Sequence, residues 1–133
     1  MSETVWAHLP NAGLVDEILA DVETRSKVWG AAWYIADLTI GATAVGAAWD
    51  AAYAVAWGAG RGGATDVASK IEAESRLKYA AADAALALLT WDSSADLLAL
   101  TPDALRTIID TCDGDVKHQA VLLLPAVIAR STV

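Results

Sequence analysis

Residues 28–60 form an Ala-rich segment that carries only two charged residues, Asp37 and Asp50. Four of the six tryptophans of the chain lie in this segment, at positions 29, 33, 49 and 57. Ala is the strongest helix former, and its small side chain lets helices approach closely. A helix that is apolar on all sides has to be surrounded. The segment therefore favours a fold in which helices cover one another.

Helical spacing of apolar residues runs from residue 12 to residue 58. An unbroken helix of this length would extend about 70 Å, whereas a compact domain of this size has a radius of gyration of about 14 Å. We expect breaks at residues 24–26 and 39–46, the second of which holds two Gly and four β-branched residues. The alternative is an elongated protein that packs against other copies.

The flanking segments also carry helix signals. Asn11 is a candidate N-cap for the first helix, and residues 58–63 are a Gly-rich turn. Thr65 is expected to cap a helix that runs to about residue 90, with an exposed first half and a buried second half. In the first half, i,i+4 pairs of opposite charge continue as far as Lys78.

Helix boundaries are clearest in the C-terminal third. Thr101 and Pro102 are typical of an N-cap followed by a first-turn proline. Gly114 is expected to separate the last two helices, and Pro125 is expected to kink or split the last one. No segment alternates as a strand does, so residues 1–133 are predicted to form one all-α domain, a compact bundle of five to seven helices. The predicted core residues are Trp33, Ile35, Trp49, Leu77, Leu88 and Leu123.

Composition excludes several functions. The formal net charge is −8, which disfavours binding to nucleic acid or to an anionic membrane. The single cysteine, Cys112, excludes an internal disulfide and a multi-thiolate metal site. Residues 1–6 do not have the pattern of a signal peptide. We therefore expect a cytoplasmic protein that binds no nucleic acid.

The glycine turn has the spacing of a nucleotide-binding loop. Gly58, Gly60 and Gly63 satisfy G-x-G-x-x-G, but that fingerprint requires a preceding strand, and a helix is expected here. Gly60, Arg61, Gly62 and Gly63 are candidates for an anion-binding site at the start of the next helix. The favoured interpretation is a flexible turn between two helices.

Asp37, Asp50 and Asp83 lie in otherwise apolar segments. Clustered buried carboxylates can bind metal or exchange protons, and burial raises their pKa values. The Glu-x-x-His pairs of di-metal bundles do not occur in the chain, so we predict no metal site and no cofactor. The alternative is that each Asp reaches a helix margin or pairs with Arg25, Lys27, a Trp N–H group or a helix cap.

Aromatic residues at helical spacing are the remaining candidates for a binding surface. Trp is a preferred interface anchor, and a chain this short has little material to surround an apolar helix. We therefore expect a homo-oligomer whose interface candidates are Trp29, Trp49, Tyr53 and Trp57. One alternative is a pocket lined by Trp and Asp that binds or sequesters a small molecule such as a nucleotide. A membrane-associated helix across residues 38–57 is the third reading, disfavoured by an Asp in mid-span.

Residues 47–53 read Ala-Ala-Trp-Asp-Ala-Ala-Tyr, and residues 120–129 read Ala-Val-Leu-Leu-Leu-Pro-Ala-Val-Ile-Ala. These segments resemble small accessory proteins of bacteriophages, including phages of actinobacteria, that are rich in Trp-Asp-Ala-Ala units. The resemblance implies an accessory protein that binds a host protein in the cytoplasm of the bacterial host, and it assigns no functional residues. With no nucleophile motif in the chain, we expect a non-enzymatic interaction protein.

Overall fold

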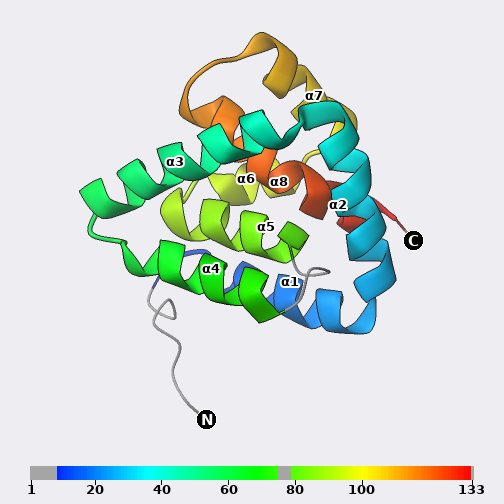
Figure 1. The fold of residues 1–133 in the computed structure, drawn as a ribbon, viewed down its shortest axis with the longest axis horizontal. Coiled ribbons are helices and arrows are strands. Elements are labelled where there is room, and N and C mark those ends of the chain that lie inside the picture. The colour runs from blue at the N-terminus through cyan, green and yellow to red at the C-terminus, as the bar shows by residue number, and fades with distance from the viewer. Residues whose placement is uncertain (1–8, 75–78, 133) are drawn as a thin grey trace.

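The computed structural model describes residues 9–74 and 79–132, and these residues form helices but no strand (Figure 1). The helices are α1 (Ala12–Thr24), α2 (Ser26–Ile40), α3 (Ala42–Gly58), α4 (Gly63–Glu74), α5 (Tyr79–Thr90), α6 (Ser94–Leu98), α7 (Pro102–Thr111) and α8 (Asp115–Ser131). The predicted all-α fold is confirmed. The eight helices of the described residues exceed the predicted range by one.

The additional helix comes from the segment predicted as one helix from Thr65 to about residue 90. That prediction is wrong, because α4 and α5 are separate helices that lie side by side (Figure 1). The predicted pair that includes Lys78 lies outside the described residues. The side-by-side arrangement buries Val67 and Ile71 of α4. Burial of these apolar side chains favours the side-by-side arrangement of α4 and α5 over one continuous helix.

The central helix of the fold is α5. Every residue from Ala80 to Thr90 is buried, and α1, α2, α3, α4 and α8 all contact this helix (Figure 1). Its sequence has Ala and Leu on every side and one charged residue, Asp83. The predicted burial of this half of the segment is confirmed, and the helix is covered by protein on all sides as its composition requires.

Distant side chains cap the C-terminal end of α5. The Asn11 amide nitrogen Nδ2 donates hydrogen bonds to the backbone oxygens of Leu88, Trp91 and Asp92, at 3.0, 3.3 and 3.1 Å. Arg61 donates a further hydrogen bond to the same helix end. The last carbonyls of a helix have no intrahelical partner. Asn11 precedes α1 as predicted, but its side chain makes no N-cap hydrogen bond there, so its role is to cap α5.

Both predicted breaks in residues 12–58 are confirmed, at Arg25 and at Gly41. Gly41 has φ 87° and ψ 153°, a backbone conformation that is essentially restricted to glycine. The two helices that meet there, α2 and α3, are bent by 100° relative to each other. The glycine therefore turns the Ala-rich segment around the core.

Alanine, more than tryptophan, forms the buried faces of α2 and α3. The buried positions are Ala32 and Ala36 on α2, beside Trp29, and Ala48, Ala52 and Ala56 on α3. Small side chains let both helices lie close to α5 and α8. The larger side chains are thereby displaced toward the surface.

The predicted core is confirmed only in part. Leu88 and Leu123 are buried, but Trp33 and Trp49 are half-buried. The prediction for Ile35 is wrong, since its side chain is 45% exposed. Leu77 lies outside the described residues. Trp33 and Trp49 nevertheless pack against the core. Ile35 is misplaced because sequence periodicity does not say which apolar stripe of α2 faces inward.

The caps of α7 and α8 agree with the prediction. The Thr101 hydroxyl accepts a hydrogen bond from the Ala104 backbone N–H at 3.1 Å, and Pro102 begins the helix. Gly114, at φ 75°, separates α7 from α8. The prediction that Pro125 splits the last helix is wrong, because α8 continues through this residue. Most residues on both sides of Pro125 are buried, so packing compensates for the hydrogen bond that proline cannot donate.

Candidate functional site

The surface between α2, α3 and α4 is hollowed into a pocket of about 600 Å³. Each helix contributes two aromatic or polar residues, spaced three or four positions apart and therefore on one face of the helix, and Ala42, Val45 and Gly46 of α3 complete the lining. The pairs are Trp33 and Asp37 from α2, Trp49 and Tyr53 from α3, and Ser69 and Glu72 from α4. The structure thus contains a pocket lined by Trp and Asp, which is one of the alternatives left open by the sequence.

Edge-to-face contacts hold the aromatic rings of the pocket. Trp49 and Tyr53 have ring centroids 5.9 Å apart and ring planes at 67°. Trp33 makes a similar contact with Tyr79 at the start of α5, at 5.3 Å and 62°. Such contacts add to the burial of aromatic rings and restrict their rotamers. The aromatic side of the pocket is therefore largely preformed.

Asp83, a buried residue of α5, accepts a hydrogen bond from Trp49, which lines the pocket. The Trp49 indole Nε1–H donates to Oδ1 of Asp83 at 2.8 Å, and Asp83 is 5% exposed. Burial raises the pKa of Asp83 to about 7; the Trp49 hydrogen bond lowers it, and the negative charges of Glu72 and Asp37 raise it. The negative charges of two residues that line the pocket thus act on the buried carboxyl group of Asp83.

The three Asp residues in apolar segments have different environments. Asp37 lines the pocket, Asp50 is exposed, and Asp83 pairs with a Trp N–H group. The pairing interpretation is confirmed for Asp83. Within the part of the chain that the structure describes, no group of three or more His, Cys, Asp or Glu side chains is placed to hold a metal ion.

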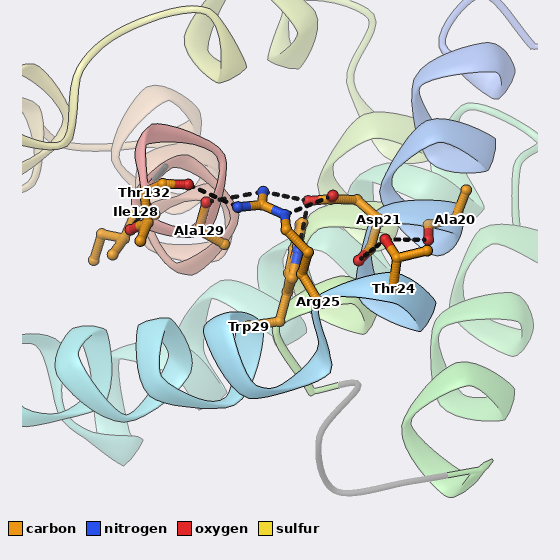
Figure 2. A network of polar contacts seen from close by, with 8 residues as sticks. All are labelled: Ala20, Asp21, Thr24, Arg25, Trp29, Ile128, Ala129 and Thr132. Atoms are coloured by element: carbon orange, nitrogen blue, oxygen red, sulfur yellow. Dashed lines mark hydrogen bonds and ion pairs between the residues drawn. The ribbon is translucent and has the colours of Figure 1, made fainter.

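A second polar cluster lies where α1, α2 and the end of α8 meet (Figure 2). Arg25 donates from Nε to Oδ1 of Asp21 at 2.8 Å and from Nη2 to Oδ2 at 2.6 Å. Its guanidinium also donates to the backbone oxygens of Thr132 and Ala129, at 2.7 and 3.2 Å. The Trp29 indole N–H donates to Oδ2 of Asp21 at 2.8 Å. This cluster ties the C-terminal end of α8 to α1 and α2.

Charges in this second cluster neutralise one another. The hydrogen bond from Arg25 lowers the pKa of Asp21, burial opposes the shift, and the Trp29 hydrogen bond adds to the lowering. The adjoining cavity of about 530 Å³ is lined by Asp21, Arg25 and Trp29 of this cluster, and also by Glu17 and Arg130. Trp29 is fully buried within the chain. Its assignment as an interface anchor is therefore wrong, since the helix face that carries it turns inward.

In the glycine turn, several groups of the candidate anion site have hydrogen-bond partners within the chain. Arg61 donates from Nη1 to Oδ1 of Asp92 at 2.8 Å, and the hydrogen bond from Arg61 lowers the pKa of Asp92. The Gly60 N–H donates to the Trp57 backbone oxygen and the Arg61 N–H to that of Ala56. These two bonds are the Schellman ending of a helix, with Gly60 at φ 75°. The cation and both amides thus have partners, and the favoured interpretation of a helix–helix turn agrees with the structure.

Gly62 and Gly63 complete this turn. A Cβ atom at Gly62 would lie 2.7 Å from the Trp57 ring, whereas one at Gly63 would meet nothing within 4 Å. A side chain at Gly62 would therefore displace the Trp57 ring, which lies against the backbone of this turn. The other interface candidates remain partly accessible: Trp57 is 65% and Tyr53 37% exposed, and Trp49 is half-buried.

The outward side of α2 carries an apolar surface that was not among the predicted sites. Tyr34, Ile35 and Leu38 are 61%, 45% and 69% exposed. The i,i+4 spacing of Tyr34 and Leu38 places these two on the side opposite Ala32 and Ala36, and Ile35 lies at the edge of that side, three positions before Leu38. We call these three residues the α2 patch. Helical spacing shows that they share a face, but the sequence does not show that this face points outward.

Fold and pocket together define an all-α helical protein with a preformed aromatic and acidic surface pocket. Comparisons with protein families, with curated proteins and with solved structures found no match. Within the described residues, no helix alone is long and apolar enough to cross a membrane; α2 and α3 reach that length and composition only as a pair bent by 100°. The function is therefore argued from the surfaces themselves.

Proposed function

We propose that this chain is a non-enzymatic interaction protein that associates with a second copy through the α2 patch. The observation that carries the proposal is the exposure of Tyr34, Ile35 and Leu38, three large apolar side chains on adjacent turns of one helix. Contiguous exposed apolar surface of this kind typically marks an interaction site. A two-fold contact is economical because the same patch is used twice.

The environments of the Asp residues with displaced pKa values support a role without catalysis. Asp21, Asp83 and Asp92 are the described acids whose pKa values are clearly displaced. Each accepts a hydrogen bond from a Trp or Arg side chain. The bond to Asp21 joins α1 to α2 across their break, and the bonds to Asp83 and Asp92 join segments that are distant in the chain. Displaced pKa values can mark catalytic groups, but these three contacts have a structural explanation.

Sedimentation velocity across micromolar concentrations tests self-association. We expect a dimer that buries more than about 1,000 Å² in total. Leu38→Glu should dissociate it, since the new charge would be buried in the contact. Leu100→Glu is the matched control, because Leu100 is 41% exposed but lies outside α2. A monomer of 13.8 kDa at every concentration, or equal effects of the two variants, would contradict the proposal.

The resemblance to bacteriophage accessory proteins supports a second element of this proposal, that the chain binds a host protein in the bacterial cytoplasm. Affinity capture from bacterial lysate with three baits tests it: the natural chain, Leu38→Glu and Leu100→Glu. The proposal expects one host protein to be retained by the first and third baits and lost with the second. Retention by all three would place host binding on another surface.

A second candidate function is small-molecule binding at the pocket between α2, α3 and α4. The specific observation in its favour is a space of about 600 Å³ with aromatic and polar lining, within the usual size range of ligand sites. Changes in Trp fluorescence against a panel of metabolites and nucleotides would test it. Self-association and ligand binding use different faces of α2, so each can fail without the other.

A further inference from the structure

We propose that the pocket between α2, α3 and α4 binds an organic ammonium cation, a protonated or quaternary amine. The inference rests on the second candidate function, small-molecule binding, and names the class of ligand. It does not depend on self-association. Its basis is the combination of two carboxylates with aromatic rings around one cavity.

The charge of the pocket selects a cation. Asp37 and Glu72 line it from opposite helices, α2 and α4, and none of the described lining residues is basic. The phosphates of a nucleotide would meet both carboxylates without a compensating charge, so the nucleotide alternative is disfavoured. Asp83, behind Trp49, adds a third carboxyl group whose ionisation a bound cation would favour.

The aromatic residues select an organic cation. Trp33, Trp49 and Tyr53 all line the same pocket, and an ammonium group over the face of Trp or Tyr is attracted by the ring electrons. Aromatic rings combined with carboxylates are the chemistry that recognises quaternary ammonium groups. A neutral aromatic ligand would use the rings but would leave both carboxylates without a partner.

A bare metal ion fits the pocket less well. Within the described residues no set of three or more potential metal ligands is brought together, and the space of about 600 Å³ is far larger than an ion requires. Ser69, which also lines the pocket, offers one hydroxyl to a polar substituent of the ligand. An amine that carries a short polar arm would therefore use the whole lining.

Choline and 3,3-dimethyl-1-butanol separate the role of charge from that of shape, since the second compound replaces the ammonium nitrogen with carbon. Each is titrated into the full chain by calorimetry and by NMR observation of the indole N–H signals. We expect choline to bind saturably and to shift the Trp49 signal, while the neutral compound binds at least about tenfold more weakly.

Three variants locate the site. Asp37→Asn and Glu72→Gln should each weaken choline binding about three- to tenfold. Asp50→Asn is the matched control: it removes one carboxylate from the exposed side of α3, outside the pocket lining, and should leave affinity unchanged. Equal loss in all three variants would indicate a general charge effect and overturn the proposal.

The possible failures are distinguishable. Equal affinity for choline and the neutral compound would overturn the cation inference but keep small-molecule binding. No binding of either compound, or choline binding that leaves the Trp49 signal unmoved, would overturn the assignment of an ammonium ligand to this pocket. Self-association is read separately by sedimentation of the same samples.

Discussion

The indole N–H of Trp49 donates a 2.8 Å hydrogen bond to a carboxylate oxygen of Asp83, and this bond joins a partly exposed helix to the innermost one. A buried polar group costs free energy unless it is hydrogen-bonded. The indole supplies a hydrogen bond but no positive charge. Burial therefore still dominates, and the pKa of Asp83 is raised to about 7.

The first prediction concerns stability against pH. The pKa of Asp83 is about 7 in the folded chain, against an ordinary value of 3.8, so between these values the folded state holds a proton that the unfolded state has lost. The free energy of unfolding should therefore fall as pH rises from about 4 to about 7, and then level off. The change is of the order of a few kcal/mol, since each unit of pKa corresponds to about 1.4 kcal/mol.

Asp83→Asn is the control for this prediction. Denaturation with urea at several pH values should show the decline in the natural chain and a much smaller one in the variant. The lowered pKa values of Asp21 and Asp92 act in the opposite direction: their contributions are present above about pH 4 and are lost as pH falls further. Parallel curves for the two proteins would show that Asp83 does not titrate in this range.

Features that depend on single residues could be predicted from the sequence. Thr101 with Pro102, Gly114 and the break near Gly41 follow local rules for caps and glycine conformations, and all three are found. The reversal between α4 and α5 could not be predicted, because residues 75–78 contain neither Gly nor Pro. The side-by-side arrangement follows only from the burial of residues within α4 and α5.

A pocket lined by Trp and Asp is one of the alternatives that the sequence offers, but the sequence does not say which residues line it. The sequence allows a Trp N–H group to pair with an Asp, but Trp49 and Asp83 are 34 positions apart, and no local pattern connects them. Similarly, Trp29 and Trp57 have the same residue type in the same segment but are 0% and 65% exposed. Which of them faces inward is decided by the tertiary packing of α2 and α3.

That contrast gives the second prediction. Trp29→Ala should lower the free energy of unfolding by about 3–5 kcal/mol, because a large buried side chain is lost and a cavity remains. Trp57→Ala should cost less than about 1 kcal/mol, as expected for an exposed side chain. Chemical denaturation of both variants measures the difference. Similar losses would mean that Trp29 is not part of the core as described.

The third prediction concerns the bend between α2 and α3. Gly41→Ala should destabilise the chain by about 1–3 kcal/mol, because φ 87° with ψ 153° is strained for any residue with a Cβ atom. Gly46→Ala is the matched control: Gly46 lies within α3, and an added Cβ would meet nothing within 4 Å, so helix propensity should make it neutral or stabilising by about 0.5–1 kcal/mol. Thermal unfolding should therefore show a lower Tm for Gly41→Ala and an unchanged or higher Tm for Gly46→Ala. An unchanged Tm for Gly41→Ala would contradict the described bend.

The last prediction distinguishes the observed role of Asn11, as the cap of α5, from the role that the sequence predicts, as the N-cap of α1. As an N-cap of α1, Asn11 could be replaced by Asp with little loss, since both residues are good caps. As the cap of α5, it acts through its amide N–H₂ group, which donates to the backbone oxygens of Leu88, Trp91 and Asp92. Asp has no such donor, and its carboxylate would face these oxygens in a buried position. Asn11→Asp should therefore lower the free energy of unfolding by at least about 2 kcal/mol, the cost of leaving buried acceptors unpaired, and urea denaturation at neutral pH should detect it. Stability within about 0.5 kcal/mol of the natural chain would show that the N-cap role is sufficient.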